Sequence, residues 1–203
     1  MLAQKLSTPT KNAIKPGKSA FLVIDMYESL NKSYFSYSAT SAYNKTKWLA
    51  DHFTYSHESV VANICNTILL AKRLGIETFV ITYEDRVIDS KILKAAGYPQ
   101  IISKYELDAF NPKCNLIKNL QNISVKNVII SGYHRDACVY FTADGAVKND
   151  FGVIIANPLT LGKTIKREYS QTTKQFRQIA HFYSTLDKLY EVMHQLSPLK
   201  LAK

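Results

Sequence analysis

Residues 126–156 read KNVIISGYHRDACVYFTADGAVKNDFGVIIA and contain two strand patterns separated by a helical one. The first strand is predicted over Lys126–Ser131 and the second over Gly152–Ala156, with a helix from about Asp136 to Lys148 between them. Each strand is centred on a Val-Ile-Ile run without polar alternation, which is typical of parallel strands buried on both faces. This order of elements predicts a right-handed crossover unit of a parallel sheet.

The same alternation of apolar runs and helical periods extends over the rest of the chain. Ala20–Asp25 (AFLVID) is predicted to be a buried strand that stops at a carboxylate, and Glu77–Tyr83 (ETFVITY) is predicted to be another. Helices are expected over residues 58–74, where Gly75 closes the pattern, over residues 91–96, from Pro112, and through the C-terminal third to Met193. We therefore expect an α/β fold, a three-layer α/β/α sandwich around a mostly parallel, doubly wound sheet.

The length of 203 residues suits one domain with a sizeable core, which we place at residues 1–203 with the core at about 18–195. Residues 31–57 interrupt the alternation, because this segment is rich in Ser and Tyr and contains the only tryptophan, Trp48. Connections of this length usually serve as lids or binding loops, so a lid-like insertion is predicted there.

The composition argues against several classes of protein. The chain is 46% hydrophobic and 21% charged, which is enough apolar surface to fold, and no apolar run reaches the roughly 18 residues that cross a bilayer. No signal-peptide core and no Cys-x-x-Cys pair are present, so we expect a cytoplasmic protein without a membrane partner. The basic residues behind the net charge of +10 are spread along the chain, which favours a solvated surface over specific nucleic-acid binding. No Gly-x-Gly-x-x-Gly follows a strand, and no cofactor is expected.

Polar residues gather where the predicted strands end. Asp25 follows the first strand, Tyr83 ends the second, and the turn SGYHRDAC (131–138) follows the third. Ligands of such sheets bind at the carboxyl ends of the strands, so these residues are expected to share one site. Cys138 falls in the first turn of the next helix, where the helix dipole lowers the pKa of a thiol. A small buried cysteine packed between helix and sheet explains the same position equally well.

Four segments in this order resemble the isochorismatase-like cysteine hydrolase superfamily, which includes nicotinamidases, N-carbamoylsarcosine amidases and ureidoacrylate hydrolases. The segments are AFLVIDMYESL, NICNTILLAKRLGIETFVIT, SKYELDAF and VIISGYHRDACVYFTADGAVKNDFGVIIA, and the resemblance runs from about residue 18 to residue 157. The resemblance implies the isochorismatase-like hydrolase fold and a homo-oligomer.

The resemblance also implies a catalytic triad of Asp25, Lys104 and Cys138. In this reading Asp25 accepts the thiol proton, Lys104 stabilises the thiolate, and the sulfur attacks a carbonyl carbon to give a thioester. The resemblance further implies a cis peptide between Tyr133 and His134, and an oxyanion hole made of the backbone N–H groups of His134 and Cys138. Taken alone, Lys104 reads as a surface lysine and Asp25 as a helix cap.

Three departures from the family pattern bear on the substrate. Arg135 replaces the usual Thr of the turn, and it either pairs with Asp136 at the surface, the slightly favoured alternative, or points inward to bind an anionic substrate. Tyr27 replaces a frequent Gln, and the segment TYEDRV lacks the histidine of the nicotinamidase metal site, so no metal is expected. The candidate substrate-binding residues are Tyr27, Tyr83, Phe110 and Arg135.

The leading hypothesis is a metal-independent cysteine hydrolase that cleaves a C–N bond of a small amide or ureido compound. One alternative is a catalytically silent member that binds a metabolite or a protein. Another is an isochorismatase-type hydrolase of a vinyl ether.

Overall fold

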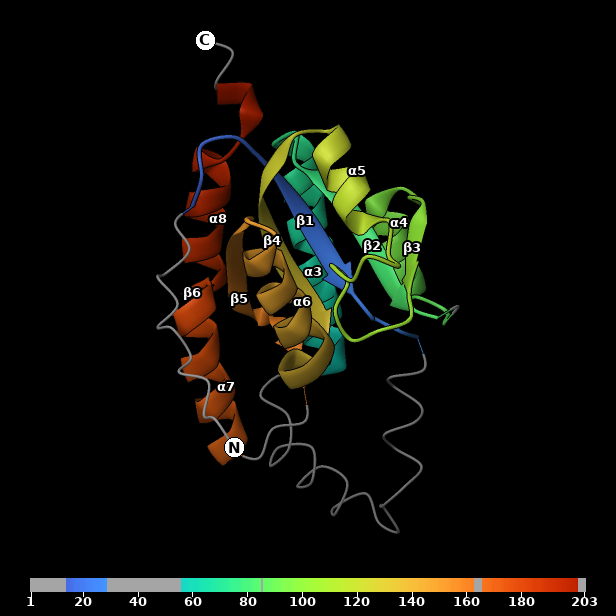
Figure 1. Cartoon of the computed structure of the whole chain (residues 1–203), viewed down its shortest axis with the longest axis vertical. Coiled ribbons are helices and arrows are strands. Elements are labelled where there is room, and N and C mark those ends of the chain that lie inside the picture. The colour runs from blue at the N-terminus through green and yellow to red at the C-terminus, as the bar shows by residue number, and fades with distance from the viewer. Residues whose placement is uncertain (1–13, 29–55, 85, 163–165, 201–203) are drawn as a thin grey trace.

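A parallel sheet forms the centre of the protein in the computed structural model, which describes residues 14–28, 56–84, 86–162 and 166–200. Every pair of neighbouring strands is parallel, and the order across the sheet is β3-β2-β1-β4-β5-β6 (Figure 1). The strands are β1 Lys18–Ile24, β2 Glu77–Tyr83, β3 Ile101–Lys104, β4 Val125–Tyr133, β5 Gly152–Leu161 and β6 His181–Tyr183. The order reverses between β1 and β4, as expected for a doubly wound sheet.

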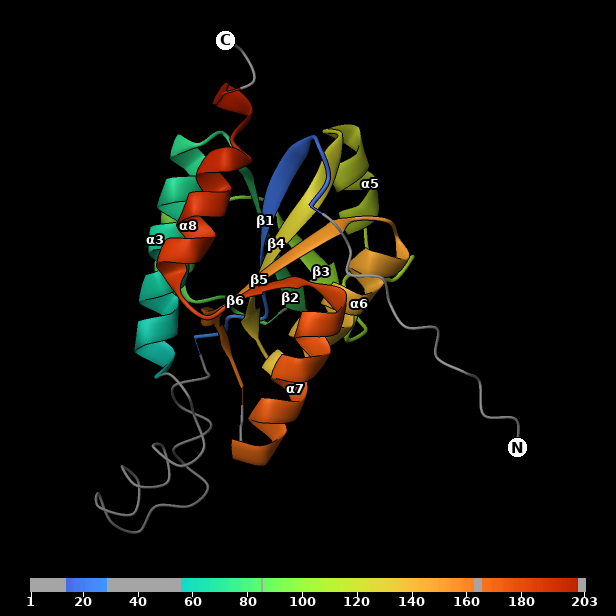
Figure 2. The same cartoon turned by 90° about the vertical axis from the view of Figure 1, so that its left-hand side faces the viewer.

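Helices cover both faces of the sheet (Figure 2). They are α3 His57–Arg73, α4 Ser90–Ala96, α5 Leu116–Asn122, α6 Tyr140–Lys148, α7 Lys166–Ile179 and α8 Leu186–Gln195. One hydrophobic core lies between the sheet and α3, α4 and α8, and a second lies between the sheet and α5, α6 and α7. Successive residues of β1 enter opposite cores, because side chains alternate along a strand. The predicted three-layer α/β/α sandwich is therefore confirmed.

The main departures from the predicted elements lie at the edges of the sheet. The short edge strands β3 and β6 were not predicted, and the helix expected from Pro112 begins at Leu116 instead. β5 continues to Leu161, beyond the predicted end at Ala156. The expected lid lies outside the described residues as far as residue 55, and its last residue, His57, begins α3. None of the described helices is both long enough and apolar enough to pass through a membrane.

Gly132 holds β1 and β4 unusually close together where the strand order reverses. Its φ is +122°, and a Cβ at this position would lie 1.9 Å from the carbonyl oxygen of Ile24. Ile24 and Gly132 are register partners, and Asp25 follows directly. A side chain at residue 132 would therefore push the end of β1 away from β4.

We expect Gly132→Ala to lower the free energy of unfolding by about 3 kcal/mol, from backbone strain together with the clash. Gly97→Ala is the matched control, because Gly97 also has a positive φ (+78°) but open space around its Cβ position. Gly97→Ala should lower the free energy of unfolding by only about 1 kcal/mol. Urea unfolding measures the free energy of unfolding of both variants. Equal losses of stability would show that the close approach of β1 and β4 does not require glycine at residue 132.

Candidate active site

A buried ion pair between Asp25 and Lys104 lies at the carboxyl end of the sheet. The Lys104 Nζ is 2.8 Å from the Asp25 Oδ2, and each residue is only 1% exposed. Asp25 follows β1 with a φ of +52°, and its backbone N–H donates to the carbonyl of Ile81 at 2.9 Å. Lys104 ends β3 and also donates to the carbonyl of Glu106 at 3.1 Å. The two charges thus lie at the carboxyl ends of β1 and β3, which β2 separates in the sheet.

Cys138 completes this cluster from the turn that follows β4. Its thiol is close enough to Asp25 and Lys104 for both charges to act on its pKa. Burial and the Asp25 carboxylate raise the pKa of Cys138 to about 11, although Lys104 opposes the shift. The structure therefore brings together all three residues of the expected triad.

The raised pKa contradicts the expectation that a helix dipole lowers the pKa of this thiol. Residues Arg135–Val139 form a π-helical turn, and the α-helix α6 begins only at Tyr140. Burial outweighs any effect of the helix end here. Cys138 is consequently a protonated thiol at neutral pH, next to a carboxylate that can accept its proton.

The peptide bond between Tyr133 and His134 is cis, as the resemblance implies. The carbonyl of His134 accepts from the backbone N–H groups of Ala137 and Val139, at 3.0 and 3.1 Å. The His134 Nδ1 lies 2.5 Å from the Asp136 Oδ1. Hydrogen bonds and an ion pair among its own residues thus stabilise the turn between β4 and α6. The ion-pair partner of Asp136 is His134.

Arg135 is buried, so the expectation of a surface pair with Asp136 is wrong. The residue is 1% exposed, and its guanidinium donates to the side chains of Asn157 and, at 2.8 Å, Thr173. The guanidinium carbon also lies 5.5 Å from the ring centroids of both Phe176 and Phe182. Arg135 therefore connects the turn that carries Cys138 to β5, α7 and β6, in an environment that accommodates a buried cation through hydrogen bonds and aromatic faces.

Two of the candidate substrate-binding residues, Tyr27 and Tyr83, contact the ion pair. The Tyr27 hydroxyl accepts from the backbone N–H of Tyr83 at 2.9 Å and lies close to the Asp25 carboxylate. Burial and the Asp25 carboxylate raise the pKa of Tyr27, which keeps its hydroxyl protonated as a donor. The ring of Tyr83 has the Lys104 Nζ 5.1 Å from its centroid.

The fourth candidate, Phe110, packs in the core instead. Its ring lies 5.3 Å from that of Phe151, centroid to centroid, and the residue is 2% exposed. Arg86 of the TYEDRV segment is a further residue near the site, because its guanidinium lies over the rings of Tyr27 and Tyr83; no local sequence signal indicates these contacts.

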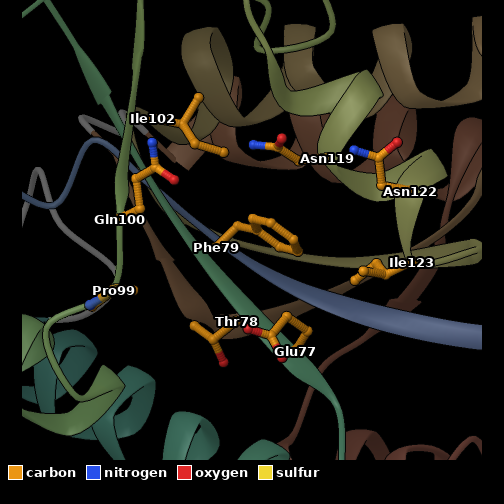
Figure 3. Close-up of a pocket in the computed structure, with 9 residues that line it drawn as sticks. All are labelled: Glu77, Thr78, Phe79, Pro99, Gln100, Ile102, Asn119, Asn122 and Ile123. Atoms are coloured by element: carbon orange, nitrogen blue, oxygen red, sulfur yellow. The ribbon is translucent and has the colours of Figure 1, made fainter.

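A separate pocket of about 320 Å³ lies at the amino end of β2, next to β3 and α5. Asn119 and Asn122 of α5 lie across it from Phe79 of β2 (Figure 3). This position is opposite to the end of β2 that carries Tyr83, so the pocket is not part of the triad's site. Within the described ranges, no three His, Cys, Asp or Glu side chains gather closely enough to hold a metal ion.

Comparison with solved structures finds the same fold in proteins of differing activity. The MAR1 ribonuclease of Caenorhabditis elegans matches with a TM-score of 0.65 at 18% identity, over 87% of this chain and 81% of that one. An octameric hydrolase of unknown specificity from Escherichia coli matches with a TM-score of 0.62 at 16% identity, over 82% and 75%. The N-carbamoylsarcosine amidase of Thermoplasma acidophilum matches with a TM-score of 0.57 at 15% identity, over 82% and 96%.

No curated protein matches the sequence of the chain. A sequence model of the isochorismatase domain, in contrast, matches residues 19–185. This match includes all strands of the sheet and all three residues of the buried cluster. The chain therefore belongs to the isochorismatase family of hydrolases.

Proposed function

We propose that this protein hydrolyses a C–N bond of a small amide or ureido compound through a thioester on Cys138. The observation that carries the proposal is the buried cluster in which one thiol lies beside both members of the Asp25–Lys104 ion pair. Nucleophilic catalysis by a thiol needs a base in contact with it and a positive charge that stabilises the sulfur anion. Asp25 and Lys104 supply these two groups.

The first half of the proposed reaction forms the thioester. Asp25 accepts the thiol proton while the Cys138 sulfur attacks the carbonyl carbon, and the oxyanion is held by the backbone N–H groups of His134 and Cys138. Asp25 then passes the proton to the departing nitrogen, and the C–N bond breaks to release ammonia or an amine. A thiol with a raised pKa suits this sequence, because its proton needs to leave only during the attack.

The second half of the reaction returns the enzyme to its starting state. Asp25, again ionised, accepts a proton from a water molecule that attacks the thioester carbon. The C–S bond breaks, the sulfur regains its proton, and the acid product leaves. Lys104 stays charged throughout, where it stabilises the sulfur anion and fixes Asp25.

The amidase relative supports cleavage of a C–N bond, since it shares this fold. The retained thiol of Cys138 also favours acyl transfer over cleavage of a vinyl ether. The octameric relative supports a homo-oligomeric assembly.

We expect Cys138→Ser to reduce turnover at least about a thousandfold, because a hydroxyl is a much weaker nucleophile than a thiol under the same base. Ammonia release from a panel of amides and ureides measures this. Cys65→Ser is the control, since Cys65 lies on α3 and packs against the core on the opposite face of the sheet. The control should keep full activity. Equal turnover by Cys138→Ser and the wild type would remove the basis of the proposal.

We also expect the losses caused by Asp25→Asn and by Cys138→Ser not to add. Groups that act as one unit give a double variant about as inactive as the worse single variant. The measurement is kcat/KM of both single variants and the double variant, with circular dichroism to verify that each is folded. Multiplicative losses would indicate that Asp25 acts independently of the thiol.

A further inference from the structure

Arg86 is an exposed cation next to the proposed site that the mechanism above does not use. It lies just beyond β2, and its guanidinium carbon is 5.4 Å from the ring centroid of Tyr27 and 5.7 Å from that of Tyr83. Its backbone carbonyl accepts from the Thr82 hydroxyl at 3.0 Å. Val87, which follows Arg86, is held in the same way, because its carbonyl accepts from the backbone N–H of Glu28 at 3.2 Å. The backbone of Arg86 is therefore held in place, and its guanidinium lies near both tyrosine rings.

The two tyrosines beneath Arg86 are the same ones that contact the ion pair. The Tyr27 hydroxyl lies close to the Asp25 carboxylate, and the centroid of the Tyr83 ring lies 5.1 Å from the Lys104 Nζ. A single aromatic side chain thus separates Arg86 from each member of the pair. A positive charge thus lies against the same two tyrosine rings that contact the ion pair beside Cys138.

The guanidinium has donors to offer to a ligand. No carboxylate in the described part of the chain forms an ion pair with Arg86. Stacking on aromatic rings uses the face of a guanidinium and leaves the N–H groups at its edge for a planar anion, which a carboxylate fits with two parallel hydrogen bonds. The net charge of +10 adds a general attraction for anions.

We propose that Arg86 binds a carboxylate of the substrate, so that the substrate class is an anionic amide or ureide. This inference rests on the proposed function, because the reacting carbonyl is placed at Cys138. Arg86 acts on binding and not on the bond-breaking steps. Its removal should therefore raise KM for anionic substrates and leave neutral ones unaffected.

The test is protection of Cys138 from iodoacetamide, followed by peptide mass spectrometry with Cys65 as the internal reference. The protecting compounds are three pairs of equal chain length: malonamate and propionamide, succinamate and butyramide, glutaramate and valeramide. In the wild type, at least one anionic member should protect at a concentration tenfold or more below that of its neutral partner. Arg86→Gln should abolish this preference, and Arg86→Lys should retain part of it.

Three results would each overturn the inference. The two members of every pair protect equally, no anionic member protects, or Arg86→Gln keeps the preference for the anionic member. Ammonia release from the same compounds separates the two proposals. Cys138-dependent release without a preference for anions leaves the proposed function standing and removes the role of Arg86. Arg86-dependent protection by compounds that Cys138 does not hydrolyse supports the carboxylate site and counts against the proposed function.

Discussion

The ion pair between Lys104 and Asp25 is the interaction on which the rest of the site depends. Both charges are buried, so each is tolerated only because the other lies 2.8 Å away, and removing one partner of such a pair typically costs about 3–5 kcal/mol. The two residues come from β1 and β3, on either side of β2. The pairing of these three strands therefore fixes the distance between the charges, and the fold and the chemistry rest on the same sheet.

The remaining parts of the site are arranged around this pair. Cys138 reaches it from the turn after β4, and its thiol keeps its proton because burial and Asp25 outweigh the attraction of Lys104. Arg135 holds that turn from the other side through Asn157, Thr173 and two phenylalanine rings. Arg135 thereby connects the turn that carries Cys138 to α7. The small threonine usual in the family at this position is too short to make that connection.

The central features were predictable from the sequence, and the errors have physical causes. The long apolar runs of β1, β2 and β4 indicated a parallel sheet, and the ends of these strands indicated where Asp25 and Cys138 meet. The edge strands β3 and β6 are short and only partly buried, so their sequences carry no comparable apolar pattern. The Arg135 side chain is buried because it contacts Thr173, Phe176 and Phe182. These residues are distant in sequence, so the local sequence around Arg135 does not indicate the contacts. Burial also decides the pKa of Cys138, whereas local sequence indicated only a helix end.

The most direct test of this account is the pH dependence of alkylation at Cys138, measured site by site by mass spectrometry. The account predicts that the rate keeps rising through pH 9 with a midpoint near 11, because the thiol remains protonated beside Asp25. In Asp25→Asn the midpoint should fall, since Lys104 then acts on the thiolate without an opposing carboxylate. A midpoint below the value of about 8.5 for a free thiol in the wild type, or no change in Asp25→Asn, would contradict it.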